Sequence, residues 1–387
     1  MKAALRLTLA LVSLSMSFVA KAEPGFNPIT DKSTPSSVVE ASKYLYEFWG
    51  PGDVQQVDRK TYLQLANKIT AIKSKNFREK MAFMVAKAEV QRCKKLDLPI
   101  CSVSSVPARG SAFLVSGGLL ATVVHNFLTD SALLKYFGNL RQKWNSDLAS
   151  DDTGVRDIAL TQVKHFTQNP LEDSIFFVTD KNENIVFSSL DGKYAFVRWR
   201  SISKPIAKVD LSCDEKNNCS VGDIRIDSYS VNNPPLMISP ATLVDDIALI
   251  KIDSSAGIQV SQQNCLPGQK NYIVGYPAKT KNRKALGFKD AADRMLVYTE
   301  GVVVETSDLK KLSEWSGIDN LISFYSDKSI LLTDGDGWPG MSGGAILNDQ
   351  GQACAVFNGS APYSGELTVN PISKRFNLYS SGVPFSH

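Results

Sequence analysis

One serine in this sequence lies within a cluster of glycines, an arrangement that suits a nucleophile. The stretch Gly340-Met341-Ser342-Gly343-Gly344 predicts a tight turn, because glycine adopts backbone conformations that other residues avoid. In such a turn the N–H groups of Gly340 and Ser342 can point toward one spot and form an oxyanion hole, which stabilises the charge that develops during acyl transfer. A serine hydroxyl is a weak nucleophile, so a base must take its proton as it attacks.

A histidine and an aspartate in strand contexts can supply that base and its partner. His125 stands at the end of the predicted strand 119–124, and the chain has only 3 histidines. The unperturbed pKa of histidine, near neutrality, suits a general base. Asp246 directly precedes the predicted strand 247–252, and an aspartate there would hold the imidazole in the productive tautomer. Asp245 is the rival for this role.

Together these segments resemble the motifs of the trypsin-like, or chymotrypsin-fold, serine peptidases. Residues 121–126 correspond to the strand-ending histidine motif, 246–249 to the Asp-Ile-Ala-Leu motif and 340–344 to the Gly-x-Ser-Gly-Gly motif. Their order along the chain agrees with the family, and the resemblance extends over residues 105–365. The chain departs from the animal digestive members at Met341, where those enzymes have an aspartate that pairs with a newly cleaved amino terminus.

The resemblance implies a role for each candidate catalytic residue. His125 would be the general base, Asp246 its orienting partner and Ser342 the nucleophile. Gly340 and Ser342 would donate the oxyanion hydrogen bonds. Asp246 is preferred to Asp245 because it occupies the aspartate position of the family motif.

The resemblance also implies where a substrate would bind. Asp336 lies where trypsin-like members place the carboxylate that receives a lysine or arginine side chain, although a solvated turn at 334–337 is the alternative. Asn358, Gly359 and Ser360 follow the strand that pairs with an extended substrate backbone in the family.

The implied fold is an all-β core of two six-stranded antiparallel β-barrels, chymotrypsin-like, with an N-terminal helical extension. Apolar residues recur at helical spacing within residues 30–97 and predict three amphipathic helices, which could be a propeptide, a layer on the barrels or a partner-binding element. Between His125 and Asp246 an insertion is expected, with a helix at 131–144 and strands at 174–178 and 195–199. The expected units are a signal peptide at 1–22, a helical region at 23–104, a first barrel with His, Asp and the insertion at 105–260, and a second barrel with Ser at 261–387.

The start of the chain has the features of a secretory signal peptide. Lys2 and Arg6 precede the apolar run 7–20, and Ala20-Lys21-Ala22 provides a cleavage site of small residues. No later stretch is long and apolar enough to span a membrane. We therefore expect a periplasmic or secreted bacterial protein that has no membrane attachment once the signal is removed.

Six cysteines in an exported chain predict disulfides. Sequence proximity suggests Cys93 with Cys101 and Cys213 with Cys219, which leaves Cys265 with Cys354. Because no Cys-x-x-Cys pair and no nearby histidine accompany them, we expect neither a metal nor another cofactor.

The sequence thus predicts an exported serine endopeptidase that hydrolyses peptide bonds in proteins or peptides through an acyl-enzyme, with a preference for Lys or Arg if Asp336 lines the pocket. Two alternatives remain: a catalytically silent module that uses the scaffold for binding, and an esterase with the same triad. The formal net charge is only +4 and the basic residues are scattered, which argues against a nucleic-acid partner. The sequence does not indicate an oligomeric state.

Overall fold

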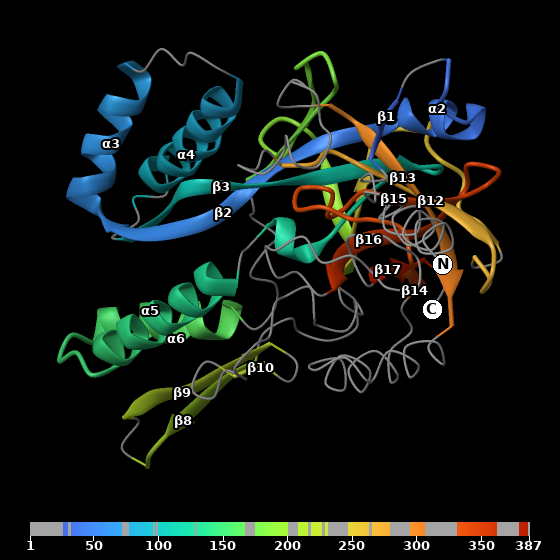
Figure 1. Ribbon diagram of the computed structural model, residues 1–387. Coiled ribbons are helices and arrows are strands. Elements are labelled where there is room, and N and C mark those ends of the chain that lie inside the picture. The colour runs from blue at the N-terminus through green and yellow to red at the C-terminus, as the bar shows by residue number, and fades with distance from the viewer. Residues whose placement is uncertain are drawn as a thin grey trace, which may run out of the picture.

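A computed structural model gives the architecture of most of the chain (Figure 1). It describes residues 26–29, 32–71, 77–95, 97, 100–127, 130–166, 175–199, 208–215, 218–226, 229–230, 247–262, 265–278, 295–305, 331–361 and 379–385. The signal peptide predicted at 1–22 lies outside these residues.

The C-terminal part of the chain forms a closed antiparallel barrel. Its sheet runs in the order β1-β13-β12-β15-β16-β17-β14, and an additional pairing of β13 with β14 closes six of these strands into a ring. The strands are β1 (Asn27–Pro28), β12 (Lys270–Gly275), β13 (Val297–Val304), β14 (Leu331–Thr333), β15 (Ala345–Asn348), β16 (Ala353–Ala361) and β17 (Tyr379–Pro384). β1 comes from the start of the described chain and adds to the outside of this ring.

The other sheet is curled, and its edges do not pair with each other in the described part of the chain. Its order is β6-β5-β2-β3-β4-β11-β7, with every neighbouring pair antiparallel. The strands are β2 (Leu45–Asp58), β3 (Ile100–Val115), β4 (Leu119–Thr122), β5 (Phe177–Thr179), β6 (Ile185–Ser188), β7 (Tyr194–Trp199) and β11 (Ala248–Ile252). The predicted all-β core of two antiparallel barrels is confirmed, with a curled seven-stranded sheet as its first half.

The first of the three predicted helices is helical only in its first half. The helix α2 (Ser36–Ser42) ends early, and the chain continues as β2, whereas α3 (Arg59–Ala71) and α4 (Phe77–Lys95) are helical as predicted. Leu45, Phe48 and Trp49 are all buried, because both faces of β2 are covered. Apolar residues on both faces of a strand produce the three- and four-residue spacing that resembles a helix.

Helices lie beside the first sheet in two groups (Figure 1). The long strands β2 and β3 extend beyond the sheet and carry α3 and α4 at their far end. The insertion after β4 forms α5 (Asp130–Leu148) and α6 (Thr153–Phe166), which lie near the small sheet of β8 (Lys208–Cys213), β9 (Cys219–Ile226) and β10 (Tyr229–Ser230). Asn145 on α5 joins the two, because its side chain hydrogen-bonds both the N–H and the C=O of Val221 on β9.

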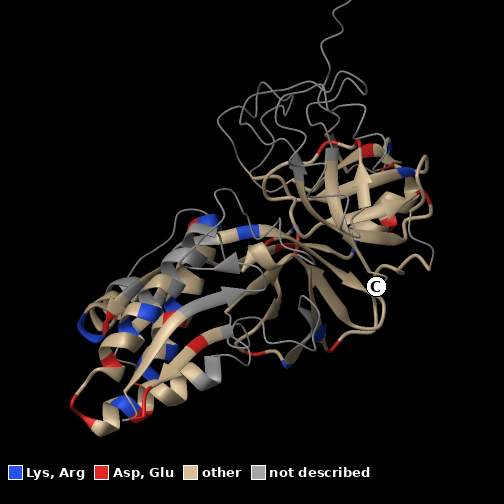
Figure 2. Ribbon diagram, turned by 90° about the horizontal axis from the view of Figure 1, so that it is seen from below, with Lys and Arg blue, Asp and Glu red and all other residues tan. Residues whose placement is uncertain are grey.

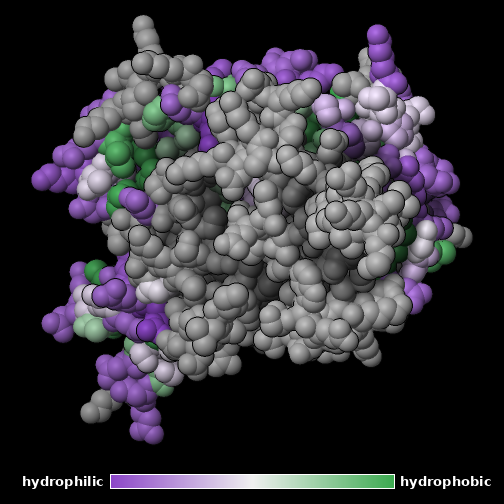
Figure 3. Space-filling model, in the orientation of Figure 1, coloured by the Kyte–Doolittle hydropathy of each residue, from purple (hydrophilic) through white to green (hydrophobic). Residues whose placement is uncertain are grey.

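The helices beside the first sheet carry charged residues of both signs and some hydrophobic surface. Figure 2 shows Lys, Arg, Asp and Glu interspersed along them. Figure 3 shows hydrophobic residues toward the middle of the lobe formed by α3 and α4, with hydrophilic residues along its rim. None of the helices in the described part of the chain combines the length and apolar content that crossing a bilayer requires.

A buried cluster joins the two sheets. It includes Phe113 and Val115 from β3, Val274 from β12 and Leu347 from β15. Side chains from both halves of the molecule therefore pack closely where the two sheets meet, which we call the seam.

The structure contains the three predicted disulfides. Cys93 is joined to Cys101, Cys213 to Cys219, and Cys265 to Cys354. The third links the beginning of the C-terminal barrel to β16, across a sequence separation of 89 residues.

Glu89 gives the protein an expected pH dependence of stability. This carboxylate on α4 is buried and accepts hydrogen bonds from the N–H and the hydroxyl of Ser104, at 2.6 and 2.8 Å. Burial raises its pKa to about 7, from 4.5 in an unfolded chain. The folded state therefore binds the proton more tightly, so the free energy of unfolding is highest below pH 4.5 and falls as pH rises through 7.

Glu89→Gln is expected to remove this pH dependence. At pH 8 the variant should be more stable than wild type by up to about 3 kcal/mol, and at pH 4 it should have no such advantage. Urea unfolding at the two pH values measures the difference. Glu79→Gln, an exposed glutamate on the same helix, is the matched control. An equal pH dependence in wild type and Glu89→Gln would contradict the expectation.

Candidate active site

The glycine-framed serine lies on a tight turn between β14 and β15. Gly340 and Gly343 have φ angles of 91° and 86°, in the left-handed region that favours glycine. Met341 is fully buried beneath the turn, and Ser342 is half-buried. The Ser342 hydroxyl donates toward the backbone oxygen of Asn358 at 3.5 Å.

Two peptide groups of this turn are held by their carbonyl oxygens. The Pro339 oxygen accepts from the N–H of Ala278 at 2.6 Å, and the Met341 oxygen accepts from the N–H of Gly344 at 2.8 Å. In a trans peptide the C=O and N–H point in opposite directions, so these bonds turn the N–H groups of Gly340 and Ser342 away from their anchors. Neither of these N–H groups donates a hydrogen bond within the described part of the chain.

His125 lies just beyond the end of β4 and is half-buried. It belongs to η1 (Val124–Asn126), a 3₁₀ helix of one turn. The next residue, Asn126, reaches across to the nucleophile turn, where its Nδ2 donates to the backbone oxygen of Ser342 at 2.9 Å. The structure therefore brings the histidine turn and the serine turn into direct contact.

The two candidate aspartates, Asp245 and Asp246, lie outside the described residues. The strand that follows them is β11, whose first residue, Ala248, pairs with Thr122 at the end of β4. His125 is three residues after Thr122. β11 thus begins beside the strand end from which the histidine follows.

Asp336 is almost completely buried, at 1% exposure, so the solvated turn considered as its alternative is wrong for this residue. Its backbone oxygen accepts from the Thr299 hydroxyl at 2.7 Å. The preceding carbonyl, that of Gly335, accepts from the Ser380 hydroxyl at 2.6 Å. These contacts hold the segment before the nucleophile turn against β13 and β17.

Asn358, Gly359 and Ser360 lie on β16, close behind the serine. The Asn358 side chain is buried and accepts from the hydroxyl of Ser381 at 2.6 Å. A Cβ atom built on Gly359 would meet no atom of the described residues within 4 Å, so the described part of the chain leaves this side of β16 uncovered.

Sequence reasoning missed Ser111 and Asn126, which join the two halves of the site. Ser111 on β3 is fully buried and donates from its N–H to the Ser342 oxygen at 2.8 Å. The available signal was an asparagine directly after an apolar strand and the candidate histidine, since an amide that is buried at such a place must find hydrogen-bond partners.

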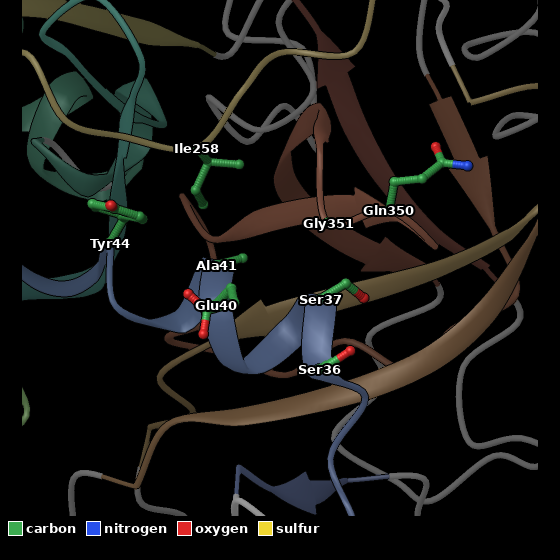
Figure 4. A pocket seen from close by; sticks show the side chains of 8 residues that line it. All are labelled: Ser36, Ser37, Glu40, Ala41, Tyr44, Ile258, Gln350 and Gly351. Atoms are coloured by element: carbon green, nitrogen blue, oxygen red, sulfur yellow. The ribbon is translucent and has the colours of Figure 1, made fainter.

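The structure also has a pocket away from these residues (Figure 4). Its volume is about 310 Å³, and residues of α2 line it together with Ile258, Gln350 and Gly351. None of the predicted site residues contributes to it. Among the described residues no cluster of His, Cys, Asp or Glu could hold a metal ion.

A comparison with protein families covers two of the three motifs. Residues 212–356 match the family model described as a trypsin-like peptidase domain, a segment that includes Asp246 and Ser342 and begins after His125. This match confirms the resemblance to trypsin-like serine peptidases. No curated protein matches the chain.

Solved structures of proteases are among those to which the chain is similar. The inactive form of the Rv3671c protease aligns with a TM-score of 0.35 and 10% identity, covering 93% of this chain and 92% of that one. The active form of the same protease, from M. tuberculosis, gives 0.35 and 10%, with coverage of 94% and 86%. A serine endoprotease from Yersinia pestis gives 0.34 and 11%, with coverage of 92% and 64%.

Proposed function

We propose that this chain, whose residues 212–356 match the model of a trypsin-like peptidase domain, is an exported serine endopeptidase that cleaves proteins or peptides through an acyl-enzyme. The observation that carries the proposal is the hydrogen bond between Asn126 Nδ2 and the Ser342 oxygen, at 2.9 Å. It ties the residue next to His125 to the backbone of Ser342, although 216 positions separate the bonded residues in sequence.

The proposed reaction uses three side chains in succession. The Ser342 hydroxyl attacks the scissile carbonyl while His125 takes its proton, and Asp246 holds the imidazole and stabilises its cation. The N–H groups of Gly340 and Ser342, which donate no hydrogen bond to any described residue, stabilise the oxyanion. His125 then protonates the leaving amine, and a water molecule that it deprotonates releases the acyl group.

The pairing of β11 with β4 supports an aspartate just before β11 as the third member, and the sequence motif favours Asp246 over Asp245. Ala248 lies opposite Thr122, and Asp246 precedes Ala248 by two residues while His125 follows Thr122 by three. In antiparallel strands, residues just before one member of a pair and just after the other lie at the same end.

The edge of β16 supports binding of an extended substrate. β17 pairs with β16 as far as Ala361, whereas pairing with β15 stops at Val356. From Asn358 onward one side of β16 therefore has no strand partner in the described chain. A peptide can add there as a further strand and pass the Ser342 hydroxyl.

Asp336 supports a preference for lysine or arginine before the cut. A carboxylate at 1% exposure near the nucleophile turn favours a cationic side chain, because burial strengthens the attraction between opposite charges. The predicted signal peptide and three disulfides support export to an oxidising compartment.

Labelling with a fluorophosphonate tests the proposal. The processed protein should react at one residue, Ser342, and Ser342→Ala should not react while keeping the wild-type melting temperature. Mass spectrometry of the labelled peptide identifies the residue. A folded wild-type protein that does not react would favour the silent binding module, and turnover of small esters without cleavage of any peptide in a library would favour the esterase.

A further inference from the structure

We propose that the side chains of Ser111 and Asn126 are positioning residues that set the oxyanion hole from the opposite sheet. This inference rests on the proposed function, because it concerns how the same nucleophile turn is held. Both residues belong to the first sheet and its histidine turn, and both bond backbone atoms of the turn in the C-terminal barrel.

The Ser111 hydroxyl both donates and accepts a hydrogen bond between the first sheet and the C-terminal barrel. Its Oγ donates to the Gly340 oxygen at 2.9 Å and accepts from the N–H of Tyr276, just after β12, at 2.8 Å. Ser111 and Tyr276 are buried and Gly340 is half-buried, so the hydroxyl itself lies away from bulk water. One hydroxyl therefore locks the Gly340–Met341 peptide to the end of β12.

Asn126 fixes the peptide on the other side of the serine. Its Nδ2 donates to the Ser342 oxygen at 2.9 Å and lies 2.9 Å from the Thr122 hydroxyl, which in turn donates to the Ser111 oxygen at 2.8 Å. The Ser342 oxygen thus accepts from two donors of the first sheet, Asn126 Nδ2 and the Ser111 N–H.

Glycines leave the space that this asparagine occupies. A Cβ built on Gly110 would lie 2.2 Å from Asn126 Nδ2, and one on Gly343 would lie 2.7 Å from the same atom and 2.0 Å from the Ser111 oxygen. A Cβ on Gly50 would lie 2.4 Å from the Asn126 backbone oxygen. The amide is therefore enclosed on several sides, and its rotamer is fixed by packing as well as by hydrogen bonds.

Along the nucleophile turn, hydrogen bonds from the first sheet alternate with hydrogen bonds from within the C-terminal barrel. The peptides after Pro339 and Met341 are held by Ala278 and Gly344 of the barrel itself, and the peptides after Gly340 and Ser342 are held by the first sheet. Each of the four successive peptide groups thus has a hydrogen-bond anchor, and these anchors restrain the orientation of the two oxyanion donors.

The test measures how fast Ser342 reacts. Inactivation by a fluorophosphonate gives a first-order rate constant and a dissociation constant for wild type, Ser111→Ala and Asn126→Ala. Each variant should lower the rate constant about 10- to 100-fold, because small displacements of reacting groups cost this much, and should leave the dissociation constant within about threefold. Partial unfolding would lower the labelled fraction without changing the rate constant of the folded fraction.

Asn348→Ala is the matched control. Asn348 is also buried, and its Nδ2 donates to the Gln352 side chain at 2.9 Å on the turn between β15 and β16, apart from the site. If the rate constants of Ser111→Ala and Asn126→Ala match that of Asn348→Ala at equal loss of melting temperature, the inference is overturned while the proposed function stands. A wild-type protein that does not react at all would overturn both.

Discussion

Replacing Asp246 by asparagine is expected to lower kcat for peptide hydrolysis about 10⁴-fold, while Asp245→Asn leaves kcat within about threefold of wild type. Asparagine has the shape of aspartate but presents an N–H group to the imidazole, which selects the tautomer that cannot accept the serine proton. The loss should appear in kcat more than in KM, because a triad aspartate acts on the reaction step and not on substrate binding.

The two variants form a matched pair, since they are neighbours and lose the same charge. A library of fluorogenic peptides supplies the substrates, and circular dichroism melting verifies that both variants are folded. A large loss in Asp245→Asn with little loss in Asp246→Asn would exchange the two assignments. Full activity in both would contradict a triad with either aspartate.

Local patterns were sufficient for the parts of the site that lie within one segment. Two short apolar runs joined by a glycine pair predicted the hairpin that ends at His125, and the glycine cluster predicted the nucleophile turn, where Gly340 and Gly343 have positive φ. The cysteine pairs followed from spacing alone, because two of them close short loops and only one pair remained.

Strand β2 shows where pattern reasoning failed. Its apolar residues are buried on both faces, so their spacing carried no period of two, and the sequence contained no local sign that residues 45–58 pair with β3 and β5. The pairing is decided by partners more than 40 residues away, which periodicity within one segment cannot detect.

The contacts of Ser111 and Asn126 were missed for a related reason. The hydroxyl of Ser111 bonds a carbonyl 229 positions away, and the amide of Asn126 bonds one 216 positions away. Ser and Asn satisfy their hydrogen bonds locally in most loops, so their types alone did not indicate an inter-sheet role. Only the packing of the two sheets brings these partners together.

The charge of the buried Asp336 side chain is expected to determine the preference for cleavage after lysine and arginine. Asp336→Asn should lower kcat/KM for such substrates on the order of 10³-fold, because removal of one partner from a buried pair of charges leaves the other unpaired in the complex. Substrates with leucine or phenylalanine at that position should change by no more than a few-fold.

The neighbouring Asp334 provides the control, because Asp334→Asn removes a charge from the same segment. Asp334 is only half-buried, and its Oδ1 accepts from the N–H of Val302 at 2.6 Å, a bond that an asparagine oxygen can keep. Cleavage of a peptide library followed by mass spectrometry gives the residue before each cut for wild type and both variants. If cuts after lysine and arginine dominate in wild type and persist in Asp336→Asn, another group selects the cation, and Asp336 serves the packing of the turn against β13 alone.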